Sequence, residues 1–523
     1  MSRKFFPQIQ AMAAGKRALF LILGLFFLCL PERALANNLS ISNVTLTSPN
    51  ATDGTIQVQF DISWSNSWRN QTNYDAAWVF IKYSTDSGTT WNHAKLETAG
   101  TNPSGVSIGS GTAIDIIVPT DLMGAFIQRS ATGSGALSTT SVQLVWDYEA
   151  NGLTASSTAR VKVFGVEMVY IPTGAFYAGD TAATGTFKQG SSDTDPWYIS
   201  SAGAISVTNT ASNGYYYTSA AFTNEDATGA TFTIPATFPN GYSAFYLMKY
   251  EVTEGEFVEF FNTLTSAQKT TRDMTGLSQG KNSDSVVDRN TIAWTSGDAT
   301  TTVSDRGVGY WTFQGTMAFY DWAALRPYTE LEFEKACRGT LAAVASESAW
   351  GNTTITQAVT ISGTENGTET ITTAGANSNY SVQTFSGGDA STGPLRVGIY
   401  ATSSSTRTQS GAGYYGNMEL SGNLSEHPVT VGNSTGRGFT GTHGNGVLTT
   451  IASYEGNATN TDWPGLDGTP SRGVTGGLGM GYRGSNWGAT GNGFMVSNRQ
   501  VAAEYNSNVH SHSGVRGART ASS

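Results

Sequence analysis

The chain has 523 residues and a formal net charge of −10, with 29 Lys and Arg against 39 Asp and Glu. This acidic balance excludes a typical nucleic-acid binder, which needs a basic face to neutralise phosphates. Two Cys exclude a disulfide scaffold, and 11 % aromatic residues exclude a disordered chain. The 61 Gly and only 13 % charged residues are typical of a loop-rich β-protein outside the cell.

Residues 1–36 have the pattern of a secretory signal peptide. Basic residues precede an apolar run at 18–30, and Ala34-Leu35-Ala36 forms a small-residue cleavage site. An uncleaved N-terminal anchor is the alternative, although the run is short for a bilayer span. Cleavage would leave 24 basic and 38 acidic residues, a net charge of −14, and one Cys. We therefore expect a secreted or cell-surface protein, extracellular or periplasmic, with no transmembrane segment after cleavage.

Residues 38–165 are predicted to form an all-β domain. Ile56–Ile62 alternates apolar and polar residues, as a half-buried strand does, and Trp78–Tyr83 is a second strand. Further strands are expected at 114–118, 142–146 and 159–164. This spacing favours an immunoglobulin- or fibronectin-like sandwich, interpreted as a spacer or adhesion module.

Residues 166–523 combine strands with a few helices. Strands are expected at Met168–Phe176 and Phe245–Val252. A capping-box spacing at Thr253 then begins a helix with one apolar face, and a second such box at Thr329 begins another. A further helix is expected from about 316 to 325. No helical pattern returns after Gly339, so the rest of this α+β region is predicted to be loop-rich.

Six stretches in this order resemble the formylglycine-generating enzyme, or sulfatase-modifying factor, family. The residues that carry the resemblance are Tyr170 to Phe176, Phe245 to Thr253, Leu325 to Gly339, Ala349-Trp350-Gly351, Ser421 to Glu426 and Gly514-Val515-Arg516. They extend over essentially all of the chain after residue 165. The resemblance implies a C-type-lectin-like fold for residues 166–523, with short strands, few helices and long loops.

The family's reaction needs residues that this chain lacks. Its enzymes oxidise a sulfatase cysteine with two cysteines that hold copper, and the resemblance places that pair after the turn at Arg483-Gly484-Ser485. No Cys follows this turn. Since Cu(I) prefers sulfur ligands, we expect no copper site and no catalytic residues. Cys337 is interpreted as a buried structural thiol rather than a reactive one. A carboxylate pair for glycoside hydrolysis stays open, although no motif indicates one.

Calcium is the ion that the resemblance implies, bound by loop oxygens as a structural cofactor. The matching residues are Asn377 with Asp389, and Asn423 with Glu426. The second pair departs from the family pattern, because Ser and His flank Glu426 where the family has tryptophans. The alternative is that Asn423 and Glu426 only cap loop backbone.

The segment 480–519 places Asn, Ser, His and aromatic residues between regular Arg and Gly positions. It resembles the variable region of retroelement-diversified lectin-fold proteins, which display a variable ligand surface on a fixed scaffold. Aromatic residues give contact area at low entropy cost, and Ser, Gly and Asn give adaptable hydrogen bonds. The candidate ligand-binding residues are Asn486, Trp487, Asn492, Phe494, Tyr505, Asn508, His510 and His512.

Within this set we expect exposed side chains at Trp487, Asn492, Phe494, Tyr505 and His510. Ordinary loop composition, or burial of Trp487 in the core, is the alternative. His510 and His512 would share one face of a strand, either as a weak metal pair or as exposed loop residues.

Three functions stay open at this point. The preferred one is a secreted or surface-displayed binding protein that uses a non-catalytic lectin-fold domain to bind an extracellular protein or glycan. The second is an enzyme of the same family, formylglycine-generating or a related oxidoreductase, with altered chemistry on an exported substrate. The third is a structural component of the cell envelope.

Overall fold

The structure is a computed structural model that describes residues 38–181, 187–191, 195–210, 214–277, 280–490, 492–505 and 509–521. The predicted signal peptide at 1–36 and the candidate Asn508 lie outside these residues. The strands up to residue 171 are β1 (Ser40–Asn50), β2 (Thr55–Arg69), β3 (Asp75–Ser84), β4 (Asn92–His93), β5 (Gly100–Thr101), β6 (Ser110–Gly111), β7 (Ile114–Val118), β8 (Ala125–Arg129), β9 (Gly133–Asp147) and β10 (Arg160–Ile171).

The later strands are mostly short. They are β11 (Phe176–Ala178), β12 (Lys188–Gln189), β13 (Trp197–Ile199), β14 (Ile205–Val207), β15 (Tyr215–Tyr216), β16 (Phe232–Ile234), β17 (Phe245–Met248), β18 (Ile361–Ser362), β19 (Thr370–Ile371) and β20 (Ala518–Thr520). The helices are α1 (Glu254–Phe261), α2 (Ser266–Arg272), α3 (Phe313–Trp322), α4 (Glu330–Arg338), α5 (Arg407–Ser410) and α6 (Ser434–Arg437), with 3-10 turns η1 (Pro470–Arg472) and η2 (Asn492–Phe494). The fold is therefore β-rich with few helices.

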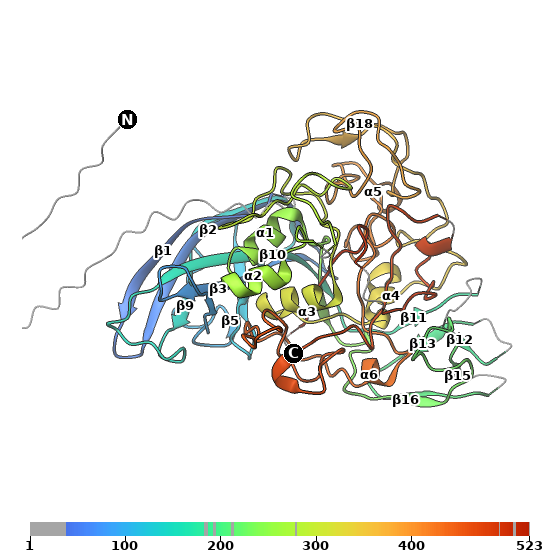
Figure 1. Ribbon diagram of the computed structural model, residues 1–523, viewed down its shortest axis with the longest axis horizontal. Coiled ribbons are helices and arrows are strands. Elements are labelled where there is room, and N and C mark those ends of the chain that lie inside the picture. Colours follow the sequence, from blue (N-terminus) through green and yellow to red (C-terminus); the bar gives the residue numbers. More distant parts are fainter. Residues whose placement is uncertain are drawn as a thin grey trace, which may run out of the picture.

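Two antiparallel sheets pack face to face at the N-terminal end of the molecule (Figure 1). The four-stranded sheet has the order β1-β2-β9-β6, and the larger one begins β5-β7-β8-β3. Alternate residues of β2, such as Phe60 and Ile62, share a core with Val79 and Ile81 of β3. Each strand expected in this region is present, and β7 has the expected bounds, but β2 and β9 extend up to nine residues beyond the predicted segments and β10 joins the strands expected at 159–164 and 168–176.

The larger sheet continues beyond the N-terminal region and forms the middle layer. Its full order is β20-β17-β10-β3-β8-β7-β5, with β4 paired to β3. All ten residues of β3 are buried, because the far face of the strand is covered as well. On that face the Phe80 and Trp322 rings meet edge to face, with 5.0 Å between ring centroids; Trp322 belongs to α3. The domain division expected at 165/166 falls inside β10, which pairs with β3 on one side and β17 on the other.

The predicted capping boxes begin α1 and α4. The Thr253 and Thr329 hydroxyls accept from the backbone N–H of the third helical residue. That residue is a Glu in both helices, and its carboxylate accepts from the backbone N–H of the capping Thr. Helix α3 begins at Phe313 rather than near 316, because the Thr312 hydroxyl accepts from the Gly315 N–H at 2.8 Å and caps the helix earlier.

Three helices were not expected from the sequence. Helix α2 has a capping box at Thr265 but no apolar stripe that could reveal it. The expectation that no helix follows Gly339 is wrong, since α5 and α6 form single turns capped by Thr406 and Asn433. Between them, the segment is held by loop hydrogen bonds rather than regular ladders.

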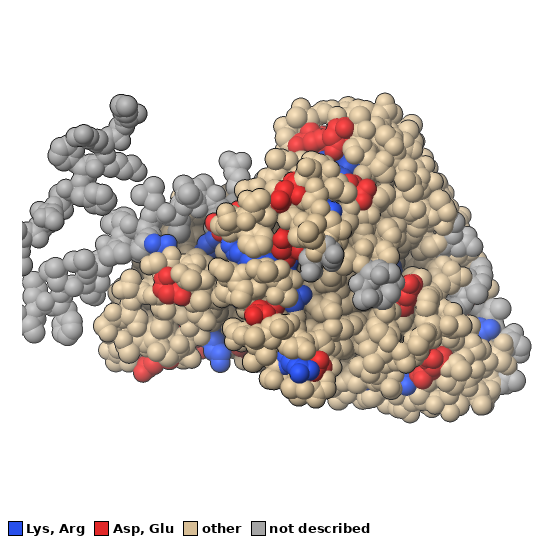
Figure 2. Space-filling view, viewed as in Figure 1, with Lys and Arg blue, Asp and Glu red and all other residues tan. Residues whose placement is uncertain are grey.

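The surface in Figure 2 is mostly uncharged, with acidic and basic side chains in small separate groups. This matches the low share of charged residues in the chain. Among the helices of the described ranges, none combines the length and apolar character needed to cross a bilayer.

Candidate ligand-binding surface

Two buried arginines tie the C-terminal segment to α4. Arg483 donates to Glu330 at 3.0 Å and to Glu334 at 2.6 Å, and Arg499 pairs with the same Glu330 at 3.0 Å. Burial alone would raise the pKa of Glu330, but the two guanidinium groups outweigh it and the pKa lies below its ordinary value. The carboxylate therefore stays charged at neutral pH and holds both arginines.

Two more arginines fix the end of the chain. Arg516 donates to Glu426 at 2.6 Å and to the Met248 carbonyl of β17 at 2.9 Å. Arg519, on β20, pairs with Asp121 of the N-terminal region. The guanidinium groups of both are completely buried. The loops between residues 483 and 516 are therefore anchored at both ends by buried arginine pairs.

A stacked histidine pair lies within these loops. The rings of His510 and His512 are 5.0 Å apart and nearly parallel, at 5°. The edge of Tyr482 meets His510 at 6.5 Å, and Trp487 meets His512 at 6.4 Å. Both histidines are half-buried. We call Tyr482, Asn486, Trp487, His510 and His512 the histidine face.

Backbone bonds hold the histidine face to neighbouring segments. The Tyr310 N–H donates to the His510 carbonyl at 3.1 Å, and the Ser425 N–H donates to the His512 carbonyl at 2.9 Å. The side-chain amide of Asn486 reaches the Ser425 hydroxyl at 2.9 Å. Burial, and secondarily His510, lowers the pKa of His512 to about 4, so its ring is neutral at pH 7. The surface that the face offers a ligand therefore comes mainly from the half-buried His510 and His512, since Tyr482 and Trp487 are buried.

The expectation of exposure is wrong for two of the candidate residues. Trp487 is 6 % exposed and Phe494 is 5 % exposed. Phe494 packs edge-on against Tyr380 at 5.0 Å, and the Trp487 backbone N–H donates to the Asn423 carbonyl at 2.8 Å. Short loops that fold back on the core bury such large rings even where the sequence is rich in Gly and Asn.

The other candidates differ in how they lie. Tyr505 is half-buried, and its hydroxyl accepts from the Asn224 amide at 2.6 Å. The side chain of Asn492 and all of Asn508 lie outside the described residues. Tyr482, which immediately precedes Arg483 in the sequence, is not among the residues that the sequence predicts to bind a ligand. Its position beside a buried anchor is the signal that could have found it.

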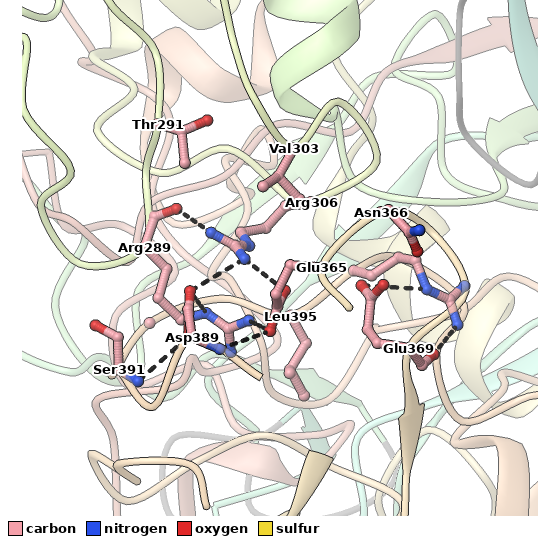
Figure 3. A network of polar contacts seen from close by, with 12 residues as sticks. Arg289, Thr291, Val303, Arg306, Glu365, Asn366, Glu369, Asp389, Ser391 and Leu395 are labelled. Atoms are coloured by element: carbon pink, nitrogen blue, oxygen red, sulfur yellow. Dashed lines mark hydrogen bonds and ion pairs between the residues drawn. The ribbon is translucent and has the colours of Figure 1, made fainter. Parts of the chain in front are cut away.

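Both residues of the first predicted calcium pair contact protein groups, and Figure 3 shows those of Asp389. The Asn377 side-chain oxygen accepts from the Thr356 N–H at 2.9 Å. Asp389 lies 3.2 Å from both Arg289 and Arg306. A carboxylate between two guanidinium groups is a poor place for a cation, so these residues do not fit a calcium site.

The second predicted calcium pair, Asn423 with Glu426, also forms its hydrogen bonds and ion pair with protein groups. The Asn423 side-chain oxygen accepts from the Leu395 N–H at 2.8 Å and so caps loop backbone. Glu426 pairs with Arg516 and accepts from the Tyr328 hydroxyl at 3.1 Å. Over the ranges that the structure describes, no group of three or more His, Cys, Asp or Glu is arranged to hold a metal. We assign no calcium to these residues.

Three buried glutamates surround Arg516, and no local sequence pattern predicts that they lie together. Burial raises the pKa of Glu251, Glu419 and Glu426, and repulsion among the carboxylates adds to it for Glu251 and Glu419. For Glu419 the pKa reaches about 7. One Arg cannot balance three carboxylates, so the cluster favours bound protons.

Cys337 lies on α4 and is completely buried. Burial raises the pKa of its thiol far above the ordinary value. A thiol without access or thiolate character is a poor nucleophile and a poor copper ligand. The expected burial of Cys337 is confirmed.

Comparisons with known proteins add little. No protein-family model matches the chain, and no curated protein matches it. Among solved structures, a similar one is Treponema denticola variable protein 1, at 13 % sequence identity and a TM-score of 0.29, covering 71 % of this chain and 98 % of that chain. At this identity and TM-score, the likeness supports no conclusion about this chain, and the family resemblance stays a prediction.

Proposed function

We propose that this protein is an exported or surface-displayed binding protein whose histidine face holds a protein or glycan ligand without transforming it. One observation carries the proposal: buried Arg–Glu pairs fix both ends of the C-terminal loops, while the His510 and His512 pair between them is only half-buried. Fixed ends lower the entropy lost when loops close on a ligand. Stacked rings then supply contact area at little further entropy cost.

The proposal assigns the two regions to known fold classes. The N-terminal sheets would form an immunoglobulin- or fibronectin-like spacer, supported by two antiparallel sheets around one core. Residues 166–523 would form a C-type-lectin-like domain of the formylglycine-generating type, supported by its few helices, short strands and long loops. Export rests on the signal pattern at 1–36.

Binding is tested with two probes of different chemistry, a glycan array and a displayed random-peptide library. Ligands selected on the unchanged protein are then measured on His510→Ala/His512→Ala. We expect at least tenfold weaker binding, which corresponds to about 1.4 kcal/mol. Tyr198→Ala removes an aromatic ring that is 42 % exposed on β13 and contacts Tyr177 rather than a residue of the histidine face, and it is the matched control. Equal losses in both variants would contradict the proposal.

The absence of chemistry needs its own test. A sulfatase-motif peptide is incubated with the purified protein, copper and oxygen. We expect unchanged peptide, because the described thiol, Cys337, is buried and its pKa is raised. Formylglycine in the product would instead support a family enzyme with altered chemistry.

Diversification of the face is the finer part of the proposal. Codons for residues 480–519 would have a near-copy downstream that differs mainly at adenines, with a reverse-transcriptase gene nearby. If the genome holds no such copy, the face binds a fixed ligand.

A further inference from the structure

A small cavity lies beside the histidine face. It has a volume of about 30 Å³ and lies between α1, the end of α2 and the segment that enters α3; the residues used below are Phe257, Phe260, Arg272, Asp273 and Trp311. A buried water needs roughly 10–15 Å³, so the cavity has room for a planar group of a few atoms. Its walls are aromatic on the α1 side.

Two buried donors belong to residues that line this cavity. Trp311 is 3 % exposed, and its indole Nε1 has no hydrogen-bond partner among the described residues. The Nε atom of Arg272 is buried and likewise has no partner there. Native proteins rarely leave buried donors unsatisfied, since each lost bond is costly. Since both residues line the cavity, an acceptor oxygen that reached both atoms would satisfy them.

The charges around the cavity select the kind of acceptor. Arg272 donates to the neutral Asn457 amide, and burial alone, with no contribution from a carboxylate among the described residues, shifts its pKa. Burial lowers its pKa to about 10, so it is charged at pH 7. Asp273 also lines the cavity, and its Oδ1 accepts from the Thr275 N–H and hydroxyl. A carboxylate ligand would face this like charge, whereas an amide brings an oxygen for the donors and an N–H for the acid.

Two residues that line the cavity form backbone hydrogen bonds with the loop that carries the histidine pair. Tyr310 and Trp311 donate their N–H groups to the carbonyls of His510 and Ser513, at 3.1 and 3.4 Å. The wall of the cavity is therefore hydrogen-bonded to the loop that carries the histidine pair.

We propose that this cavity is an anchor subsite for a carboxamide group, with the amide oxygen bound by Trp311 Nε1 and Arg272 Nε and the apolar flank against Phe257 and Phe260. The amide could come from a Gln or Asn side chain of a protein ligand or from the N-acetyl group of a sugar. Its role as an anchor rests on the proposed function, but binding of the amide itself does not.

The test is a titration of indole-¹⁵N-labelled protein with isobutyramide, followed by NMR. We expect one indole N–H resonance to shift with saturation, and this resonance to be missing in Trp311→Phe. Trp294→Phe is the matched control, because the Trp294 indole donates to the Gly297 carbonyl instead. Arg272→Lys should weaken the titration about tenfold, since it keeps the charge but removes the guanidinium Nε–H that binds the amide oxygen. No saturable shift, or an unchanged titration in Arg272→Lys, would overturn the proposal.

Two further probes separate the sources and the chemistry. Isobutyrate has the same shape with a carboxylate, and tighter binding of isobutyrate would overturn the carboxamide assignment. A shift with N-acetylglucosamine would support a glycan source, and a shift with isobutyramide alone would support a protein side chain. If Trp311→Phe does not fold, the Arg272→Lys titration decides. Loss of ligand binding in the histidine variants without any amide shift would spare the proposed function and remove only this subsite.

Discussion

At the scale of single residues, buried charge distinguishes this molecule. Its surface carries little charge, yet Arg289, Arg306, Arg483 and Arg516 are among its most deeply buried large side chains. Each has a carboxylate partner within 3.2 Å. Burying a charge is costly unless it is paired, so these pairs hold their loops in one arrangement. Charge is not balanced in the glutamate cluster, where three carboxylates, of Glu251, Glu419 and Glu426, share the single Arg516.

Glu419→Gln is predicted to change the pH dependence of stability. The folded pKa of about 7 exceeds the ordinary 4.5, so the folded state holds a proton that the unfolded chain releases. Below pH 4.5 the group contributes nothing; stability then falls as pH rises to about 7 and stays lower above it. The neutral amide avoids this loss, so the variant should gain up to about 3 kcal/mol at pH 8.

Thermal unfolding at pH 4.5 and pH 8 measures this effect. The variant and the unchanged protein should have similar midpoints at pH 4.5 and separate at pH 8. Glu97→Gln, at an exposed position, is the control and should alter neither midpoint. A Glu419→Gln midpoint below that of the unchanged protein at pH 8 would show that the carboxylate is stabilising.

At the scale of elements, α4 connects the core to the candidate surface. Its carboxylates bind Arg483 and Arg499, and its thiol faces the core. Arg483→Met is predicted to destabilise the protein by about 3–5 kcal/mol, because Glu334 then keeps only its longer pair with Arg338, at 3.4 Å, and Glu330 keeps only Arg499. Denaturant unfolding measures the loss.

The matched control for this change is Arg472→Met. Its partner Asp467 lies 3.5 Å away and the arginine is 42 % exposed, so the pair is worth at most about 1 kcal/mol. If both variants lost the same stability, the buried pairs would not be the anchors described above.

The elements also show how far the sequence predicts the structure. Helices α1 and α4 were predictable, because a capping box and an apolar face are local signals. Helix α2 was not, since its seven residues include no large apolar side chain. Burial of Trp487 and Phe494, and the gathering of Glu251, Glu419 and Glu426, depend on contacts between distant segments. No local pattern carries that information.

At the scale of the whole molecule, one sheet joins the two predicted regions. Strand β10 crosses the division at 165/166, and β17 and β20 extend the sheet that β3 begins. A fragment of residues 38–165 is predicted not to fold stably. It would expose Trp78 and Phe80, which pack against the helical layer, and it would cut β10 in half.

Circular dichroism and amide NMR of the fragment measure whether it folds. We expect poorly dispersed spectra, whereas residues 38–523 should give a cooperative transition. A folded fragment with the stability of a free domain would show that the N-terminal sandwich is independent of the rest.

The most direct test of the binding account is hydrogen–deuterium exchange of the full chain with a ligand selected from the glycan array or the peptide library. The account predicts slower exchange in residues 481–490 and 509–513, where the histidine face lies, and unchanged exchange in β1, β2 and β13. Protection confined to the N-terminal sheets or to β13, with residues 481–490 and 509–513 unchanged, would contradict it.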